Sequence, residues 1–126
     1  MKDKEPTTRN TLEQGRAKHA FEKAKRAGDK EKFASYAKKL PMMIKTNGLG
    51  ASMAFAKAKN EKAWKELFQA IEEWLKEKSY VQEALLEELV KTDSAQYRIL
   101  TSEVIAYLSW LRRFAEGFKP EKKEKG

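Results

Sequence analysis

The sequence contains no cysteine and only one histidine, and these two shortages exclude several kinds of chemistry. Without cysteine there is no disulfide, no thiolate metal site and no thiol nucleophile. The single histidine, His19, has no partner at metal-ligand spacing and falls on the polar side of the first expected helix. This position favours an exposed or helix-capping side chain, because general acid–base catalysis needs a second positioned group. We therefore expect no catalytic residue, no bound metal, no cofactor and no enzymatic activity.

Long apolar runs are also missing. No stretch approaches the ~20 residues that a membrane-spanning helix requires, and residues 1–6 lack the apolar core of a signal peptide. Glycine-rich nucleotide-binding loops and the GxSxG nucleophile motif are absent as well. The neighbouring carboxylates Glu72–Glu73 and Glu87–Glu88 point about 100° apart on a helix, so neither pair converges on one site. These absences predict a cytoplasmic protein without a membrane partner.

Helix-forming sequence takes the place of these features. Ala, Leu, Glu and Lys are abundant, and apolar residues recur at intervals of three and four, as on the core-facing side of a helix. The 126 residues are enough for one domain with a real core. We predict an all-α fold, a single compact bundle of about six helices in residues 11–118, with a flexible tail at 1–10 and a disordered charged tail at 119–126. The expected helices cover residues 11–27, 30–46, 49–59, 61–78, 79–90 and 94–118.

The expected helix boundaries carry local signals. Thr11, Asp29, Asn60 and Asp93 stand where helices should begin, and each side chain can accept a hydrogen bond from a first-turn N–H group. We therefore predict that all four residues are N-caps.

A structural corner is expected after the second helix, at Pro41, Asn47 and Gly48. Pro41 lacks an N–H group and crowds the preceding turn, which predicts a kink or a short break just before it. Gly48 is where the apolar rhythm stops, and a glycine there can take the left-handed conformation that closes a helix.

The last expected helix has two apolar stripes instead of one. The first stripe contains Leu100, Val104, Leu108, Leu111 and Ala115, and the second contains Ile99, Ala106, Trp110 and Phe114. Apolar residues over so much of the circumference predict a central helix that several others pack against.

Other apolar side chains are also expected in the core. Trp64, Trp74 and Trp110 follow helical periodicity, so core packing explains them better than base stacking. In the fifth helix, the residues expected to point inward are Leu85, Leu86, Leu89 and Val90.

Positive charge is concentrated in the first half of the chain. The net charge is +8, yet residues 1–59 carry 15 Lys/Arg and 6 Asp/Glu, a net of +9, while residues 60–126 carry 12 and 13, a net of −1. A basic face is typical of proteins that bind a phosphate backbone. A solvated lysine-rich surface that only keeps the protein soluble is the alternative interpretation.

Seven short segments span residues 14–117, and their order and spacing matter more than any one of them. They are Gln14-x-Arg16-Ala17, Leu40-Pro41-x-x-Ile44, Asn47-Gly48-Leu49, Ala54-Phe55-x-x-x-Lys59, Trp74-Leu75, Tyr97-Arg98-x-x-Thr101-x-Glu103 and Trp110-Leu111-Arg112-Arg113-Phe114-Ala115-Glu116-Gly117. In this combination the sequence resembles the small helical subunit of the type III-B CRISPR effector, the Cmr complex. It departs from the pattern at Ala56, where a bulky residue is expected.

This resemblance implies an all-α, non-enzymatic subunit that serves antiviral defence. Such subunits lie in more than one copy along the inner face of the crRNA-bound filament, where they face the guide–target duplex and help to hold the target RNA. The implied partners are the other Cmr subunits, crRNA, target RNA and neighbouring copies of the chain.

Lysines and arginines would supply the RNA contacts by neutralising phosphates, without reading the base sequence. The candidates are Arg16, Lys18, Lys23, Lys25, Arg26, Lys38, Lys39, Lys45, Lys57, Lys59, Arg112 and Arg113. Two other functions stay open at this stage: a helical adaptor whose basic face meets an acidic protein, and a small hydrolase or nuclease.

Overall fold

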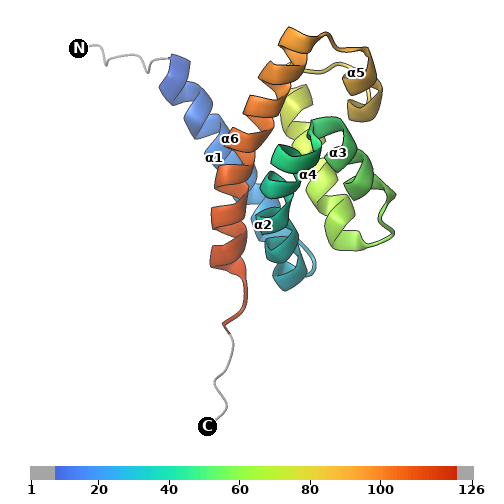
Figure 1. Cartoon of the computed structure of the whole chain (residues 1–126). Helices are drawn as coiled ribbons and strands as arrows, with labels where there is room; N and C mark the ends of the chain where they lie inside the picture. The colour runs from blue at the N-terminus through green and yellow to red at the C-terminus, as the bar shows by residue number, and fades with distance from the viewer. Residues whose placement is uncertain (1–7, 122–126) are drawn as a thin grey trace, which may run out of the picture.

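Six α-helices make up the part of the chain that the computed structural model describes, residues 8–121 (Figure 1). They are α1 (Thr8–Arg26), α2 (Lys30–Asn47), α3 (Leu49–Ala58), α4 (Lys62–Glu77), α5 (Leu85–Lys91) and α6 (Ser94–Phe118). No strand occurs between residues 8 and 121, which confirms the predicted all-α class. None of the described helices is long and apolar enough to cross a membrane. The tails predicted at 1–10 and 119–126 lie largely outside the described residues, although α1 includes residues 8–10.

The long helix α6 is central, as predicted, and both α1, which crosses behind it in Figure 1, and α2 pack against it. Helix α1 runs parallel to it, because Arg16 contacts Glu103 and Phe21 contacts Phe114 further along both helices. Helix α2 runs antiparallel, so that Lys38 lies beside the last turns of α6. This arrangement brings the C-terminal half of α6 next to both basic helices of the first half of the chain.

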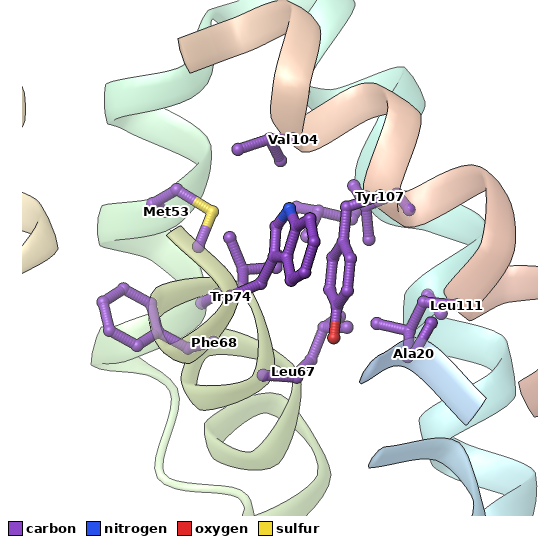
Figure 2. Packing of buried hydrophobic residues seen from close by; sticks show 14 of the residues in the cluster. Ala20, Met53, Leu67, Phe68, Trp74, Val104, Tyr107 and Leu111 are labelled. Atoms are coloured by element: carbon purple, nitrogen blue, oxygen red, sulfur yellow. The ribbon is translucent and has the colours of Figure 1, made fainter. Parts of the chain in front are cut away.

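Aromatic rings fill the centre of the core. Trp74 of α4 and Tyr107 of α6 are both fully buried and stack with their ring centroids 5.6 Å apart (Figure 2). On the α1 side of α6, Ala20 and Ala24 are fully buried, and these small side chains allow the two helix backbones to approach closely. Trp64 is also buried, which confirms the core assignment for Trp64 and Trp74.

The corner between α2 and α3 is built as expected around Gly48. Helix α2 ends at Asn47, and Gly48 has φ +91° and ψ 161°, a conformation that glycine alone adopts easily. The backbone N–H of Gly50 then donates to the Tyr97 hydroxyl at 2.7 Å, which ties the corner to α6. Pro41 does not interrupt α2, so the predicted break is absent.

Two of the four predicted N-caps are confirmed and two are wrong. Asp29 and Asp93 accept hydrogen bonds from the N–H groups of Lys32 and Gln96. Thr11 lies inside α1, which begins at Thr8 because residues 8–10 contain no glycine or proline to stop it. At α4 the N-cap is Glu61 instead of Asn60, and its carboxylate accepts from the Tyr36 hydroxyl at 2.6 Å.

Helix α5 is shorter than predicted, because residues 79–84 are not helical. Ser79 has φ +63°, a left-handed conformation at the end of α4. The Glu72 carboxylate accepts from the Leu85 N–H, and the Glu88 carboxylate accepts from the N–H groups of residues 82 and 83. Side chains thus satisfy the backbone here, and no helical turn is needed.

Five predicted core positions are exposed or only partly buried. Val90, in the last turn of α5, is 84% exposed. The second apolar stripe of α6 is incompletely covered, since Ile99 is 50% exposed and Ala106, Trp110 and Phe114 are only partly buried. The reason is that α1 and α2 occupy the two flanks of α6, and no helix among residues 8–121 covers its outer face.

The corner yields a stability prediction. Gly48→Ala should lower the free energy of unfolding by about 1–3 kcal/mol, because a Cβ strains a backbone at φ +91° and ψ 161°. Urea denaturation measures this loss. The matched control is Gly117→Ala in α6, where an added Cβ meets nothing within 4 Å. This control should be neutral or slightly stabilising, and equal losses in the two variants would contradict the explanation.

Candidate nucleic-acid interface

The C-terminal half of α6 and the middle of α2 form a basic depression. Lys38, Arg112, Arg113 and Glu116 line this open space, which has a volume of about 360 Å³. Lys38 is far in the sequence from Arg112 and Arg113, and the antiparallel packing of α2 on α6 brings the three cations together. We call this surface the α2–α6 depression.

Helical periodicity directs these cations outward. In α6, Leu108, Leu111 and Ala115 are buried, so the residues between them, Arg112 and Arg113, point away from the core. In α2, Ala37 and Leu40 are fully buried, and Lys38 is directed to solvent in the same way. The three charges are therefore held on rigid helices and not on loops.

The α2–α6 depression carries a net positive charge. Within residues 8–121, no carboxylate forms an ion pair with Lys38, Arg112 or Arg113. Glu116 pairs with Lys119 at 2.9 Å, and this lysine lowers the pKa of the Glu116 carboxyl. Three cations thus remain available to an anion, and two of them are guanidinium groups, whose planar forks match phosphate oxygens.

Most of the other predicted cations are also exposed. Lys18 and Lys45 have no ion pair within the described part of the chain, and Arg26 lies 3.7 Å from Glu22 of its own helix. Four lysines have their ammonium groups 5.1–6.0 Å from the centroid of an aromatic ring. These pairs are Lys25–Phe21, Lys39–Tyr36, Lys57–Phe68 and Lys59–Phe55.

Two of the predicted contacts, Arg16 and Lys23, are already paired with carboxylates of neighbouring helices. The guanidinium of Arg16 donates from Nε and Nη2 to Glu103 at 2.7 and 2.8 Å, and from Nη1 to the exposed Glu13 at 2.6 Å. Lys23 pairs with Glu73 of α4 at 2.6 Å. Periodicity places a residue on the edge of a helix, but it does not show that a neighbouring helix presents a carboxylate there.

Sequence reasoning missed Glu103, the acceptor at the centre of this network. Its side chain is 4% exposed and also accepts from Trp74 Nε1 at 2.8 Å and from the Tyr80 hydroxyl at 3.2 Å. Burial opposes ionisation, yet the hydrogen bonds from Arg16, Trp74 and Tyr80 leave the pKa of Glu103 below its ordinary value. A signal existed in the sequence, because position 103 lies on the same helix face as Leu100 and the buried Tyr107.

The His19 side chain is largely covered and only 10% exposed, contrary to the expectation of an exposed side chain. Its ring packs against Trp74 and Tyr107, and Nδ1 lies 2.6 Å from the Tyr107 hydroxyl. Nε2 faces Glu73 and Glu77 at 3.7 and 3.9 Å. Burial lowers the pKa of His19, although the two carboxylates act in the opposite direction and Lys23 adds to the lowering. The polar side of α1 is covered at this position because α4 and α6 meet there.

Comparisons with known families, sequences and structures all identify the same family. Residues 12–118 match the family model described as CRISPR-associated protein (Cas_Cmr5). A protein from Thermus thermophilus named CRISPR system Cmr subunit Cmr5 is 31% identical over 108 residues, which cover 83% of this chain and 93% of the relative. The crystal structure of a CRISPR-associated Cmr5 family protein from Thermus thermophilus superimposes with a TM-score of 0.76 at 28% identity, covering 86% of this chain and 97% of that one.

The buried carboxylate network yields a second prediction. Glu103→Gln should lower the free energy of unfolding by about 2–4 kcal/mol, because Arg16 loses its buried partner. Glu13→Gln removes the exposed partner of the same arginine and should cost less than about 1 kcal/mol. Urea denaturation of both variants separates these effects. A loss at position 103 no larger than that at position 13 would disprove the central role of this carboxylate.

His19 yields a third prediction, which concerns pH. The unfolded chain binds a proton at His19 near pH 6.5, whereas the folded protein does so only at lower pH, because burial lowers the pKa. Stability should therefore fall as the pH drops from 7.5 to 5.5, since the unfolded state binds more protons there. Urea melts at these two pH values test this, with His19→Gln as the control that should lose this component of the fall. An unchanged pH dependence in the variant would refute it.

Proposed function

Because the chain belongs to the Cmr5 family of CRISPR-associated proteins, we propose that it is a non-catalytic, RNA-binding subunit of a cytoplasmic Cmr effector complex. The family model spans nearly all of the described residues, and the Thermus relative is named as a Cmr subunit. In this proposal the partners are the other subunits of the complex, the crRNA and the target RNA.

The α2–α6 depression carries the RNA-binding part of the proposal. It gathers Lys38, Arg112 and Arg113 on one surface, and none of them has a carboxylate partner within residues 8–121. Contacts of this kind neutralise phosphates and do not distinguish bases, so pairing with the guide would supply the sequence specificity. The exposed lysines of α1, α2 and α3 would extend the positive surface that holds the target strand.

We further propose that several copies of the chain stack along the crRNA–target duplex. The support is a charge difference between the two ends of the molecule. Residues 83–93, around α5, carry four carboxylates and one lysine, and they lie where α6 begins. The α2–α6 depression lies near the other end of α6, which has 25 residues and is therefore about 38 Å long at 1.5 Å per residue. Acidic and basic ends favour head-to-tail contact between copies.

The non-catalytic part of the proposal agrees with the surroundings of His19. The imidazole is enclosed by Trp74 and Tyr107, with its ring nitrogens directed to protein groups. An imidazole held in this way stabilises the packing of α1 on α4 and α6.

Charge reversal in the depression tests the proposed function. Lys38→Glu, Arg112→Glu and Arg113→Glu together should weaken the binding of target RNA by the assembled complex, for all target sequences alike. Each lost phosphate contact lowers the slope of log K against log salt by roughly 0.7–0.9, so the slope should fall by about 2 to 3. Binding measurements over a series of salt concentrations give this slope.

A matched control carries the same charge change on another face. Lys62, Lys65 and Lys76 are exposed on α4, and their replacement by Glu should leave the slope nearly unchanged. Equal effects of the two triple variants would mean that net charge alone matters and that the depression is not the site. If the first variant drops out of the complex while the RNA-binding slope is kept, the basic face meets an acidic protein instead.

A further inference from the structure

An aromatic strip lies next to the α2–α6 depression and has no role in the function proposed above. Trp110, Phe114 and Phe118 follow each other along one face of α6, and Phe21 of α1 joins them at the surface. The ring centroids of neighbouring members are 5.3–5.8 Å apart, so the four rings form one continuous contact. We call these four residues the aromatic strip.

The three rings that α6 contributes to the aromatic strip pack against the core and also reach the surface. The seam between α1 and α6 is already closed by the fully buried Ala20 and Ala24, while Phe21 is 37% exposed and the three rings of α6 are only partly buried. Large apolar side chains that gather at a surface often mark a binding site. The strip is therefore a candidate binding surface.

Cations lie over two rings of the strip. The Arg113 guanidinium lies 5.7 Å from the centroid of Trp110, and Lys25 Nζ lies 6.0 Å from the centroid of Phe21. Neither cation forms an ion pair within residues 8–121. Arg113 also lines the α2–α6 depression, so the strip and the depression are parts of one surface.

Aromatic rings bordered by free cations match the chemistry of a single-stranded nucleic acid. Every base has a flat face that can stack on an aromatic ring, and the phosphates on either side pair with lysine or arginine. A protein partner with an acidic, apolar surface would also fit the rings. The observation that favours RNA is the shared Arg113, because the phosphate-binding depression continues directly into the strip.

We propose that the aromatic strip stacks unpaired bases of bound RNA while the neighbouring cations hold the phosphates. The proposal rests on the RNA-binding function and refines it. It assigns Phe21 and Trp110 to the bases, and Lys38, Arg112 and Arg113 to the backbone. It also implies a preference for RNA with unpaired nucleotides over a fully paired duplex, whose bases are stacked on one another and cannot reach the rings.

The test uses the full chain with a single-stranded oligoadenylate and with a blunt RNA duplex of the same length. Phe21→Leu keeps an apolar side chain but removes the flat ring face. It should weaken single-strand binding about 5-fold or more, because stacking of one base is typically worth ~1–3 kcal/mol. The salt slope should stay constant, since no charge changes. Phe21→Trp should retain the binding, which separates stacking from a folding defect.

Two controls sharpen the test. Phe55→Leu alters another exposed phenylalanine, 41% exposed and with Lys59 Nζ 5.1 Å from its ring centroid, and it should leave the affinity unchanged. Trp110 supplies a spectroscopic control, because Trp64 and Trp74 are only 4% and 0% exposed. Base stacking should quench Trp110 fluorescence, and Trp110→Phe should abolish the quenching.

The outcomes separate this inference from the function on which it rests. Absence of salt-dependent binding to either RNA would overturn both. Salt-dependent binding with no Trp110 quenching, and with Phe21→Leu and Phe55→Leu equal to the parent, would overturn the stacking role alone. Loss of Phe21→Leu from the assembled complex, with its RNA affinity intact, would overturn it in favour of a protein interface.

Discussion

The packing of this protein depends on one buried carboxylate. Glu103 of α6 accepts hydrogen bonds from Arg16 of α1, from Trp74 of α4 and from Tyr80, so a single side chain connects three segments of the fold. A carboxylate that is 4% exposed would be costly if it were unpaired, and here several donors compensate the lost hydration. The bonds from Arg16 and Trp74 also fix how far along α6 the helices α1 and α4 lie.

The candidate binding surface depends on how α1 and α2 lie along α6. Helix α1 lies parallel to α6 and brings Phe21 to Phe114, while the corner at Gly48 turns the chain so that α2 runs back along the other flank. Lys38 then meets Arg112 and Arg113 at the last turns of α6. Arg16 and Lys23 are neutralised by carboxylates of neighbouring helices, whereas the cations of the depression remain free within the described residues. The cations that pair within the fold therefore lie apart from the cations that are candidates for binding.

The segments that carry the family resemblance bond to one another. Arg16 and Glu103 belong to two of them and form the buried pair, and Tyr97 of the second holds the backbone just after Asn47-Gly48-Leu49. Such contacts need particular side chains at particular positions. A phosphate contact needs only a positive charge at about the right place, and a lysine one turn away can replace it. This explains why the motifs describe the fold more closely than they describe the proposed RNA-binding surface.

By itself, the sequence determined the all-α class, the bounds of α2, α3 and α6, the caps at Asp29 and Asp93, and the corner at Gly48, because these depend on neighbours within a few residues. It also identified Lys38, Arg112 and Arg113 as candidates, since charge and helix face can be read directly. Only the tertiary structure decided that Arg16 and Lys23 pair with carboxylates, that the His19 side chain is largely covered, and that Trp110 is only partly buried. The physical reason is that helical periodicity gives the direction of a side chain, whereas the partner it meets there depends on which helix packs against that face.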